Sequence, residues 1–249
     1  MHSLPGWLRL KTIKLGGSEK QRGRLRSGKV LLLAIFALSM VFVAYVVTPT
    51  LLQSMHPERR SLSAAIVDQL SANYPSQEFI ETARSVMRQA GFNVDIYAPE
   101  KVNVSLYETL PAEGHRLIVF RVHIGTTSSS PGQVLALFTS QRYNTVDYLW
   151  EQVYDQVLPA FASNRSQVVF SVTSKFIKEK SIADYRGTVI FLMGCIGLYS
   201  TELAQAFVDR GASVVIGWDG MVSAKHTDET TLTFLKTMLL DKMLSLIHI

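Results

Sequence analysis

LIVFRVH (residues 117–123) and TVIFLMGC (residues 188–195) are the two stretches of sequence that decide how this chain folds. Each is an apolar run of the length of one strand, and strands buried on both faces of a parallel sheet have this continuous apolar character. The first run ends at His123 and the second at Cys195, the single cysteine among 249 residues. Ligands of such sheets bind outside the carboxyl ends of the strands. If the two strands are neighbours, an imidazole and a thiol meet at that edge, which is the minimum equipment for nucleophilic acyl transfer.

The segments before residue 117 predict the kind of sheet to which these strands belong. Apolar residues recur at helical spacing in 77–90, and Gly91 follows where such a helix ends. Strand-like stretches at 64–70 and 92–97 flank this helix, and a short helix or loop at 102–110 follows. The order strand, helix, strand, helix, strand predicts a right-handed, mostly parallel α/β sheet.

The segments after His123 extend this pattern. A strand at 213–217 ends at Trp218 and Asp219, which places both residues at the same sheet edge as His123 and Cys195. They are candidates for lining a substrate pocket, and packing and capping are the alternative explanation. The other predicted elements are short strands at 134–139 and 168–172, a weakly helical stretch at 146–161, and helices at 202–209 and 227–243.

A membrane span is predicted ahead of this domain. Residues 30–47 (VLLLAIFALSMVFVAYVV) contain no charged residue, and a helix of this length, at about 1.5 Å per residue, just crosses a hydrocarbon core of ~30 Å. A cleaved signal peptide is the alternative. Its apolar region is usually about 7–15 residues long and precedes a small-x-small site, which residues 46–49 do not offer. We expect one uncleaved N-terminal transmembrane helix, a linker at 48–61 and a folded domain at 62–249.

Charge is concentrated ahead of the predicted span. Residues 1–29 contain eight lysines and arginines and one acid, whereas residues 30–249 contain 17 basic and 19 acidic residues. The net charge of +5 therefore comes from a basic tail, and it does not indicate a nucleic-acid-binding domain. Basic residues beside a span lie on its cytoplasmic side. We expect a cytoplasmic N-terminus and a single-pass membrane protein whose C-terminal domain is extracytoplasmic.

Other side chains that bind metals or cofactors elsewhere are weaker candidates. His226 and Asp228 are close in sequence, but two ligands do not make a metal site, and we expect a solvated helix cap. His115 follows a Glu-Gly turn and is expected to be exposed. A single cysteine excludes a disulfide within the chain. No phosphate loop or nucleotide fingerprint is present, so the sequence predicts no cofactor and no metal.

VFRVH (119–123) and VIFLMGC (189–195) resemble strand ends of the caspase-like cysteine peptidases, which include caspases, legumains, gingipains and separases. In that superfamily a histidine ends the third core strand and a cysteine ends the fourth. The block from 188 to 231, with GCIG and then GASVVIGWDG, is most similar to the gingipain branch and to caspase-related HET-associated domains. The resemblance covers about residues 62–240. It implies a caspase-like three-layer α/β sandwich with a mostly parallel sheet, and His123 and Cys195 as a catalytic dyad.

The resemblance also implies how an oxyanion is held, and the sequence departs from the family at this point. Members usually have a glycine directly after the histidine, and its backbone N–H helps to form the oxyanion hole. Here Ile124 follows His123 and the glycine comes one position later, at Gly125. A β-branched residue offers an N–H but has fewer backbone conformations. The predicted oxyanion site is the backbone of Ile124, Gly125 and Gly194, together with the N–H of Cys195.

Two functions remain open. The first is a membrane-anchored cysteine endopeptidase that acts on peptides or proteins outside the cytoplasm, with Asp219 favouring a basic side chain before the cleaved bond. The alternative is a non-catalytic ectodomain of the same fold, used for binding or sensing. Residues 243–249 (MLSLIHI) form an apolar end without a helix cap and look like translated adaptor sequence, so we expect the native chain to continue.

Overall fold

The computed structural model describes residues 62–128, 132–161 and 167–241. The chain divides into two compact units, Met1–Glu58 and Arg59–Ile249, and the described residues belong to the second unit. The predicted tail, membrane span and linker lie outside the described residues, as does the end of the chain after residue 241. Among the helices that the structure describes, none combines the length and the apolar character that crossing a membrane requires.

The larger sheet has five strands in the order β2-β1-β3-β8-β9, and every pairing is parallel. The two apolar runs that end at His123 and Cys195 form the adjacent strands β3 and β8, so the predicted mostly parallel α/β sheet is confirmed. The register pairs Leu117 with Val189 and Phe120 with Leu192. The strands are β1 (Ser63–Asp68), β2 (Asn93–Tyr97), β3 (Leu117–Arg121), β8 (Val189–Leu192) and β9 (Val214–Gly217).

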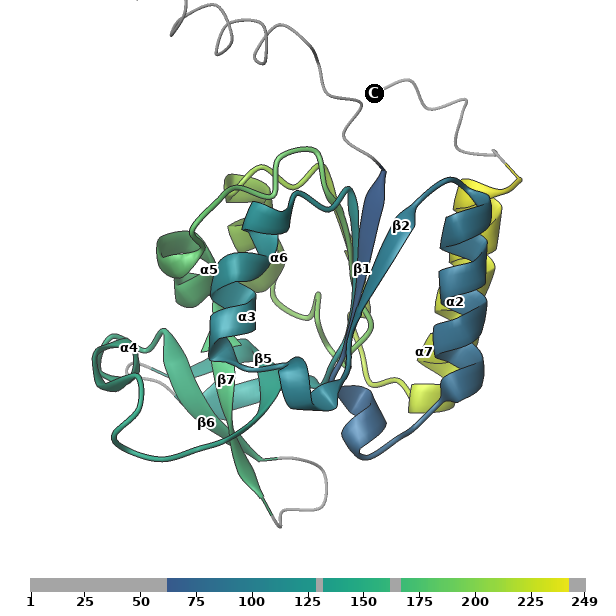
Figure 1. The fold of residues 1–249 in the computed structure, drawn as a ribbon. Coiled ribbons are helices and arrows are strands. Elements are labelled where there is room, and N and C mark those ends of the chain that lie inside the picture. The colour runs from purple at the N-terminus through teal and green to yellow at the C-terminus, as the bar shows by residue number, and fades with distance from the viewer. Residues whose placement is uncertain (1–61, 129–131, 162–166, 242–249) are drawn as a thin grey trace, which may run out of the picture. The chain divides into compact units, whose positions relative to one another are not determined.

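Helices cover both faces of this sheet, and Figure 1 shows the three layers. Residues of β3 alternate between the two cores, because successive side chains of a strand point to opposite faces. Ile118 and Phe120 join the core beneath α3, α5 and α6, whereas Leu117 and Val119 join the core beneath α2 and α7. The helices are α2 (Gln77–Gln89), α3 (Val104–Thr109), α5 (Ser174–Lys180), α6 (Thr201–Asp209) and α7 (Ala224–Leu239), with short 3-10 turns η1 (Leu70–Ala72), η2 (Pro99–Lys101) and η3 (Leu110–Glu113).

A second, antiparallel sheet follows His123 directly. Its strands are β4 (Ile124–Ser128), β5 (Gln133–Arg142), β6 (Val157–Phe161) and β7 (Val168–Thr173), in the order β4-β5-β7-β6. The predicted strands at 134–139 and 168–172 lie within it. The predicted helical stretch at 146–161 is mostly wrong: only α4 (Leu149–Val153) is helical, and β6 pairs with β7 instead. Pairing with a neighbouring strand overrides weak helical spacing here.

Candidate active site

His123 and Cys195 occupy equivalent places beyond the ends of two paired strands. Phe120 lies opposite Leu192 in the parallel register. His123 comes three residues after Phe120, and Cys195 comes three residues after Leu192. Met193 N–H donates to Phe120 O (3.0 Å), so the two chains stay in contact one residue past the ladder. Adjacent strands are ~4.8 Å apart. The structure therefore brings both residues to the carboxyl edge of the sheet, side by side in strand order.

Gly194 allows the end of β8 to approach the segment that carries His123. A Cβ atom at this position would lie 2.5 Å from Val122 O and 2.6 Å from Ile124 N. No side chain fits into that distance, because real Cβ contacts under 3.0 Å essentially do not occur. The glycine thus acts by close packing, and it determines how near Cys195 comes to residues 122–124.

The thiol of Cys195 is half-buried and is held by a backbone segment that precedes α7. Its Sγ donates to Val222 O (3.1 Å), and Val222 N–H donates to Sγ (3.5 Å). The next residue, Ile196, has φ of +53°, a conformation that is strained for a β-branched side chain. Residues with strained backbone dihedral angles are often found at functional sites. In this state the thiol is partnered by the Val222 backbone.

The imidazole of His123 lies close to two aromatic rings. Its ring centroid is 5.9 Å from that of Tyr74 and 6.0 Å from that of Phe138. Gln69, at the end of β1, accepts the backbone N–H of His123 through Oε1 (2.9 Å). Burial lowers the pKa of the imidazole, so the ring is neutral at pH 7 and able to accept a proton. Its Nε2 is buried and bonds to no other residue of the described chain.

The two backbone amides after His123 differ in their surroundings. Phe138 N–H donates to His123 O (3.0 Å), and the register pairs Ile124 with Leu137 and Gly125 with Ala136. Hydrogen-bonded and non-hydrogen-bonded pairs alternate in an antiparallel ladder. Because His123 and Phe138 form a hydrogen-bonded pair, the N–H of Ile124 does not bond to β5, whereas the backbone of Gly125 bonds to Ala136. The Ile124 amide nitrogen lies beside Gly194. Of the two predicted donors, Ile124 is therefore the one directed toward the Cys195 loop.

The two predicted pocket residues at the end of β9 have different environments. Trp218 is half-buried, and its Nε1–H donates to Thr227 Oγ1 (2.8 Å). With Gly217 it lines a cavity of about 210 Å³ beneath α7, and Asp219 is not among the residues of that cavity. Asp219 itself is exposed. Packing accounts for Trp218, whereas Asp219 remains accessible to a ligand.

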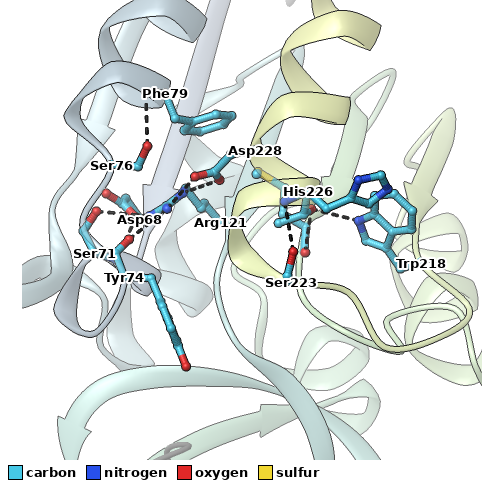
Figure 2. A network of polar contacts seen from close by, with 12 residues as sticks. Asp68, Ser71, Tyr74, Ser76, Phe79, Arg121, Trp218, Ser223, His226 and Asp228 are labelled. Carbon is cyan, nitrogen blue, oxygen red and sulfur yellow. Dashed lines mark hydrogen bonds and ion pairs between the residues drawn. The ribbon is translucent and has the colours of Figure 1, made fainter.

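A buried ionic cluster lies two residues before His123, and Figure 2 shows it. Arg121 has no exposed surface and donates to Asp68 Oδ1 (2.7 Å) and to both carboxylate oxygens of Asp228 (2.8 Å each). The register places Asp68 directly opposite Arg121 on β1. Further contacts come from Ser71 Oγ, Tyr74 O and the ring of Phe79.

The same cluster attaches the first turn of α7 to the edge that carries the candidate site. Asp228 binds Arg121, and the adjacent Thr227 donates its hydroxyl to Met193 O (2.9 Å), two residues before Cys195. The Ser223 hydroxyl caps the helix by accepting from His226 N–H (3.2 Å). Helix α7 is thus bonded to the ends of both β3 and β8.

The sequence analysis did not predict this cluster, and its expectation of solvent exposure is wrong for two residues. Asp228 was expected to be solvated but is buried, because it neutralises Arg121. His115 was expected to be exposed but is buried, because side chains of β2 cover the turn that holds it. The signal for the cluster was present: Asp68 and Arg121 are charges within otherwise apolar strands, and buried charges require partners. His226 is exposed, as a helix-cap position predicts.

Comparisons with known proteins do not assign the chain to a family. No protein-family model matches it, and no curated protein is similar to it. Among solved structures, a flavodoxin described as from Streptococcus pneumonia TIGR4 is similar at a TM-score of 0.34 and 10% identity, over 70% of this chain and 94% of that one. That similarity is too low for an argument about fold or function.

Proposed function

We propose that this chain is a caspase-like cysteine endopeptidase with His123 and Cys195 as its dyad. The observation that supports the proposal most is the equivalent placement of these two residues beyond Phe120 and Leu192, on adjacent parallel strands. A neutral, partly buried imidazole and a half-buried thiol, carried by the ends of neighbouring strands, suit general-base activation of a nucleophile. The mechanism uses no metal and no cofactor.

The chemistry proceeds in two steps. Cys195 Sγ leaves its bond to Val222 and attacks the scissile carbonyl as a thiolate, while His123 takes the thiol proton. The N–H groups of Cys195 and Ile124 hold the oxyanion; each such donor contributes roughly 3 kcal/mol in known enzymes. The C–N bond then breaks, His123 gives its proton to the leaving amine, and water hydrolyses the thioester.

Asp219 would select the substrate. Its exposed carboxylate follows β9, two strands from β3 at the same edge, and it pairs with no lysine or arginine in the described chain. A charge-assisted hydrogen bond would favour arginine or lysine before the cleaved bond. A peptide library digested by the wild type and by Asp219→Asn tests this role. We expect the basic preference to disappear in the variant, and an unchanged profile refutes it.

The cellular setting belongs to the same proposal. The apolar segment 30–47 and the basic tail 1–29 support a single-pass anchor with the catalytic domain outside the cytoplasm. The substrates would then be extracytoplasmic peptides or proteins.

Two observations favour the second candidate, a non-catalytic ectodomain for binding or sensing. The thiol is bonded to the Val222 backbone on both sides, and Ile124 stands where family members have glycine. Alkylation by iodoacetamide separates the two functions. A catalytic thiol reacts quickly near neutral pH and slows markedly in His123→Ala, since the imidazole promotes the thiolate. Slow alkylation that is equal in both proteins supports the non-catalytic function.

A further inference from the structure

An exposed apolar surface lies on the connection between β5 and β6. This connection contains α4, which lies at the periphery of the domain on the side of the antiparallel sheet (Figure 1). Five of its large apolar side chains are more than half exposed, from 54% at Leu149 to 78% at Val146. We call these five residues the α4 patch: Val146, Leu149, Trp150, Val153 and Tyr154. The patch shares no residue with the candidate active site.

The patch reverses the usual amphipathic pattern of a surface helix. Its members at 149, 150, 153 and 154 recur at helical spacing and are exposed, whereas the polar residues between them, Glu151 and Gln152, are half-buried. The apolar side of a surface helix normally faces the core. Here the polar side chains face the protein and the apolar side chains face outward.

Contacts beneath α4 hold it in this orientation. Gln152 Oε1 accepts the Tyr143 hydroxyl (2.8 Å), and Gln152 Nε2 donates to Asp147 O (2.7 Å). The ring of Tyr148 packs edge-on against Phe170, with 5.2 Å between the ring centroids. The positions beneath the turn are therefore already filled, and the apolar side chains stay at the surface.

The charges that flank the patch are paired within the domain. Lys180 Nζ lies 2.6 Å from Glu151 Oε1, and Lys175 Nζ lies 3.5 Å from Asp155 Oδ2. The patch itself contains no charged residue, and the exposed Asp147 between its members is acidic, so the local charge does not attract anionic lipid. The patch thus suits contact with uncharged, apolar material.

The predicted anchor places a bilayer within reach of this patch. Residues 30–47 form the predicted span, and the linker at 48–61 extends to at most about 50 Å. A domain of this size has a radius of gyration of about 16 Å, so any of its faces can reach the membrane. Tryptophan and tyrosine are enriched where membranes meet water, and apolar helix faces insert at the boundary between headgroups and acyl chains. Trp150 and Tyr154 give the patch this composition.

We propose that the α4 patch docks the domain on the bilayer that anchors the chain. Trp150 and its apolar neighbours would enter the boundary between headgroups and acyl chains of the extracytoplasmic leaflet. The inference rests on the membrane anchor of the proposed function and does not depend on peptidase activity. Docking would restrict the domain to one orientation at the membrane surface.

Nitroxide accessibility of the full-length chain in phosphatidylcholine vesicles tests the docking. In a Cys195→Ala parent, Val153→Cys carries a spin label on the patch, and Ser85→Cys carries one on the exposed side of α2 as the control. We expect the label at 153 to be roughly fivefold less accessible to a water-soluble nickel chelate than the label at 85, and more accessible to oxygen, which concentrates in lipid. Adding Leu149→Ser and Trp150→Ser should restore access of nickel to the label at 153, because the patch then loses most of its apolar surface.

Flotation of the vesicles separates failure of the docking from failure of the anchor. A chain that floats with the vesicles, but whose label at 153 is as accessible to nickel as the label at 85, refutes the docking and leaves the anchor standing. A chain that does not float refutes both. Shielding of the label at 153 from nickel and oxygen alike, with spin–spin broadening between labels, also refutes the docking, because a second copy of the chain then covers the patch.

Discussion

Arg121 shows how a single residue organises the candidate site. Burial lowers its pKa, but hydrogen bonds to Asp228 and Asp68 outweigh burial and raise it, so the guanidinium is charged. The desolvation cost of a buried charge is large, and only complete pairing offsets it. Here every nitrogen of the guanidinium has an acceptor. The cluster therefore specifies how β1, β3 and α7 meet, two residues before His123.

Removing the guanidinium should be costly. Arg121→Met leaves Asp68 and Asp228 buried without a counter-charge, and we expect a loss of about 3–5 kcal/mol in the free energy of unfolding. Arg186→Met is the matched control, since Arg186 pairs with Asp184 at the surface with 85% of its side chain exposed, and exposed pairs contribute about 0–1 kcal/mol. Urea unfolding of both variants measures the difference. Equal losses would show that the cluster does not stabilise the fold.

The buried imidazole predicts a pH dependence. Burial disfavours the protonated form of His123 and places its pKa below the ordinary value of 6.5. If His123 is the base of the proposed peptidase, we expect kcat/KM for peptide cleavage to decrease as pH falls through that lowered pKa, with the acid limb below pH 6.5. Tyr74→Ala exposes the ring and should move the limb upward, whereas Tyr154→Ala, on the distant α4 loop, should not. An acid limb well above pH 6.5 in the wild type contradicts this assignment.

At the scale of elements, the strand ends could be predicted from the sequence and their surroundings could not. Continuous apolar runs identified β3 and β8, because burial on both faces leaves no alternation. In the second sheet, β5 and β7 were predicted and β4 and β6 were not. The two missed strands are defined by their pairing with β5 and β7, which the sequence pattern alone does not reveal. The burial of His115 was unpredictable for a similar reason, since it depends on which side of β2 faces the η3 turn.

The close packing of Gly194, after β8, against residues 122–124, after β3, can be tested with a single substitution. Gly194→Ala places a methyl group against the backbone of residues 122–124, and overpacking of this kind costs about 1–3 kcal/mol. The displaced β8 end should also lower kcat. Gly220→Ala is the control, because a Cβ there meets no atom within 4 Å, and it should change stability by less than about 0.5 kcal/mol. Urea denaturation and peptide cleavage are the two measurements. A stable, active Gly194→Ala protein would mean that the close approach is unnecessary.

At the scale of the whole molecule, two parts of different character share one chain. The positive charge belongs to the first 29 residues, and the domain that follows residue 61 is slightly acidic. Such a division suits a cytoplasmic tail, one span and an exported domain. The domain contains one cysteine, so it is stabilised by packing and by the Arg121 cluster without an internal disulfide.

This arrangement predicts a topology. Protease added outside intact cells should remove the domain and leave a membrane-bound stub that carries the N-terminal tail, since positive charge next to a span favours the cytoplasmic side. An N-terminal epitope tag detects the stub. Reversing the charge of the eight basic residues serves as the control and should reduce correct insertion. Full protection of the domain in intact cells refutes the orientation.

Peptide cleavage by the full-length chain and by its Cys195→Ala variant tests the central proposal most directly. We predict that the wild type cleaves peptides after basic residues and that Cys195→Ala does not, with both proteins unfolding within about 1 kcal/mol of each other. Cleavage that persists in Cys195→Ala contradicts the assigned nucleophile. A folded wild-type protein that cleaves no peptide, even with its thiol reduced, contradicts the peptidase function and leaves the non-catalytic ectodomain.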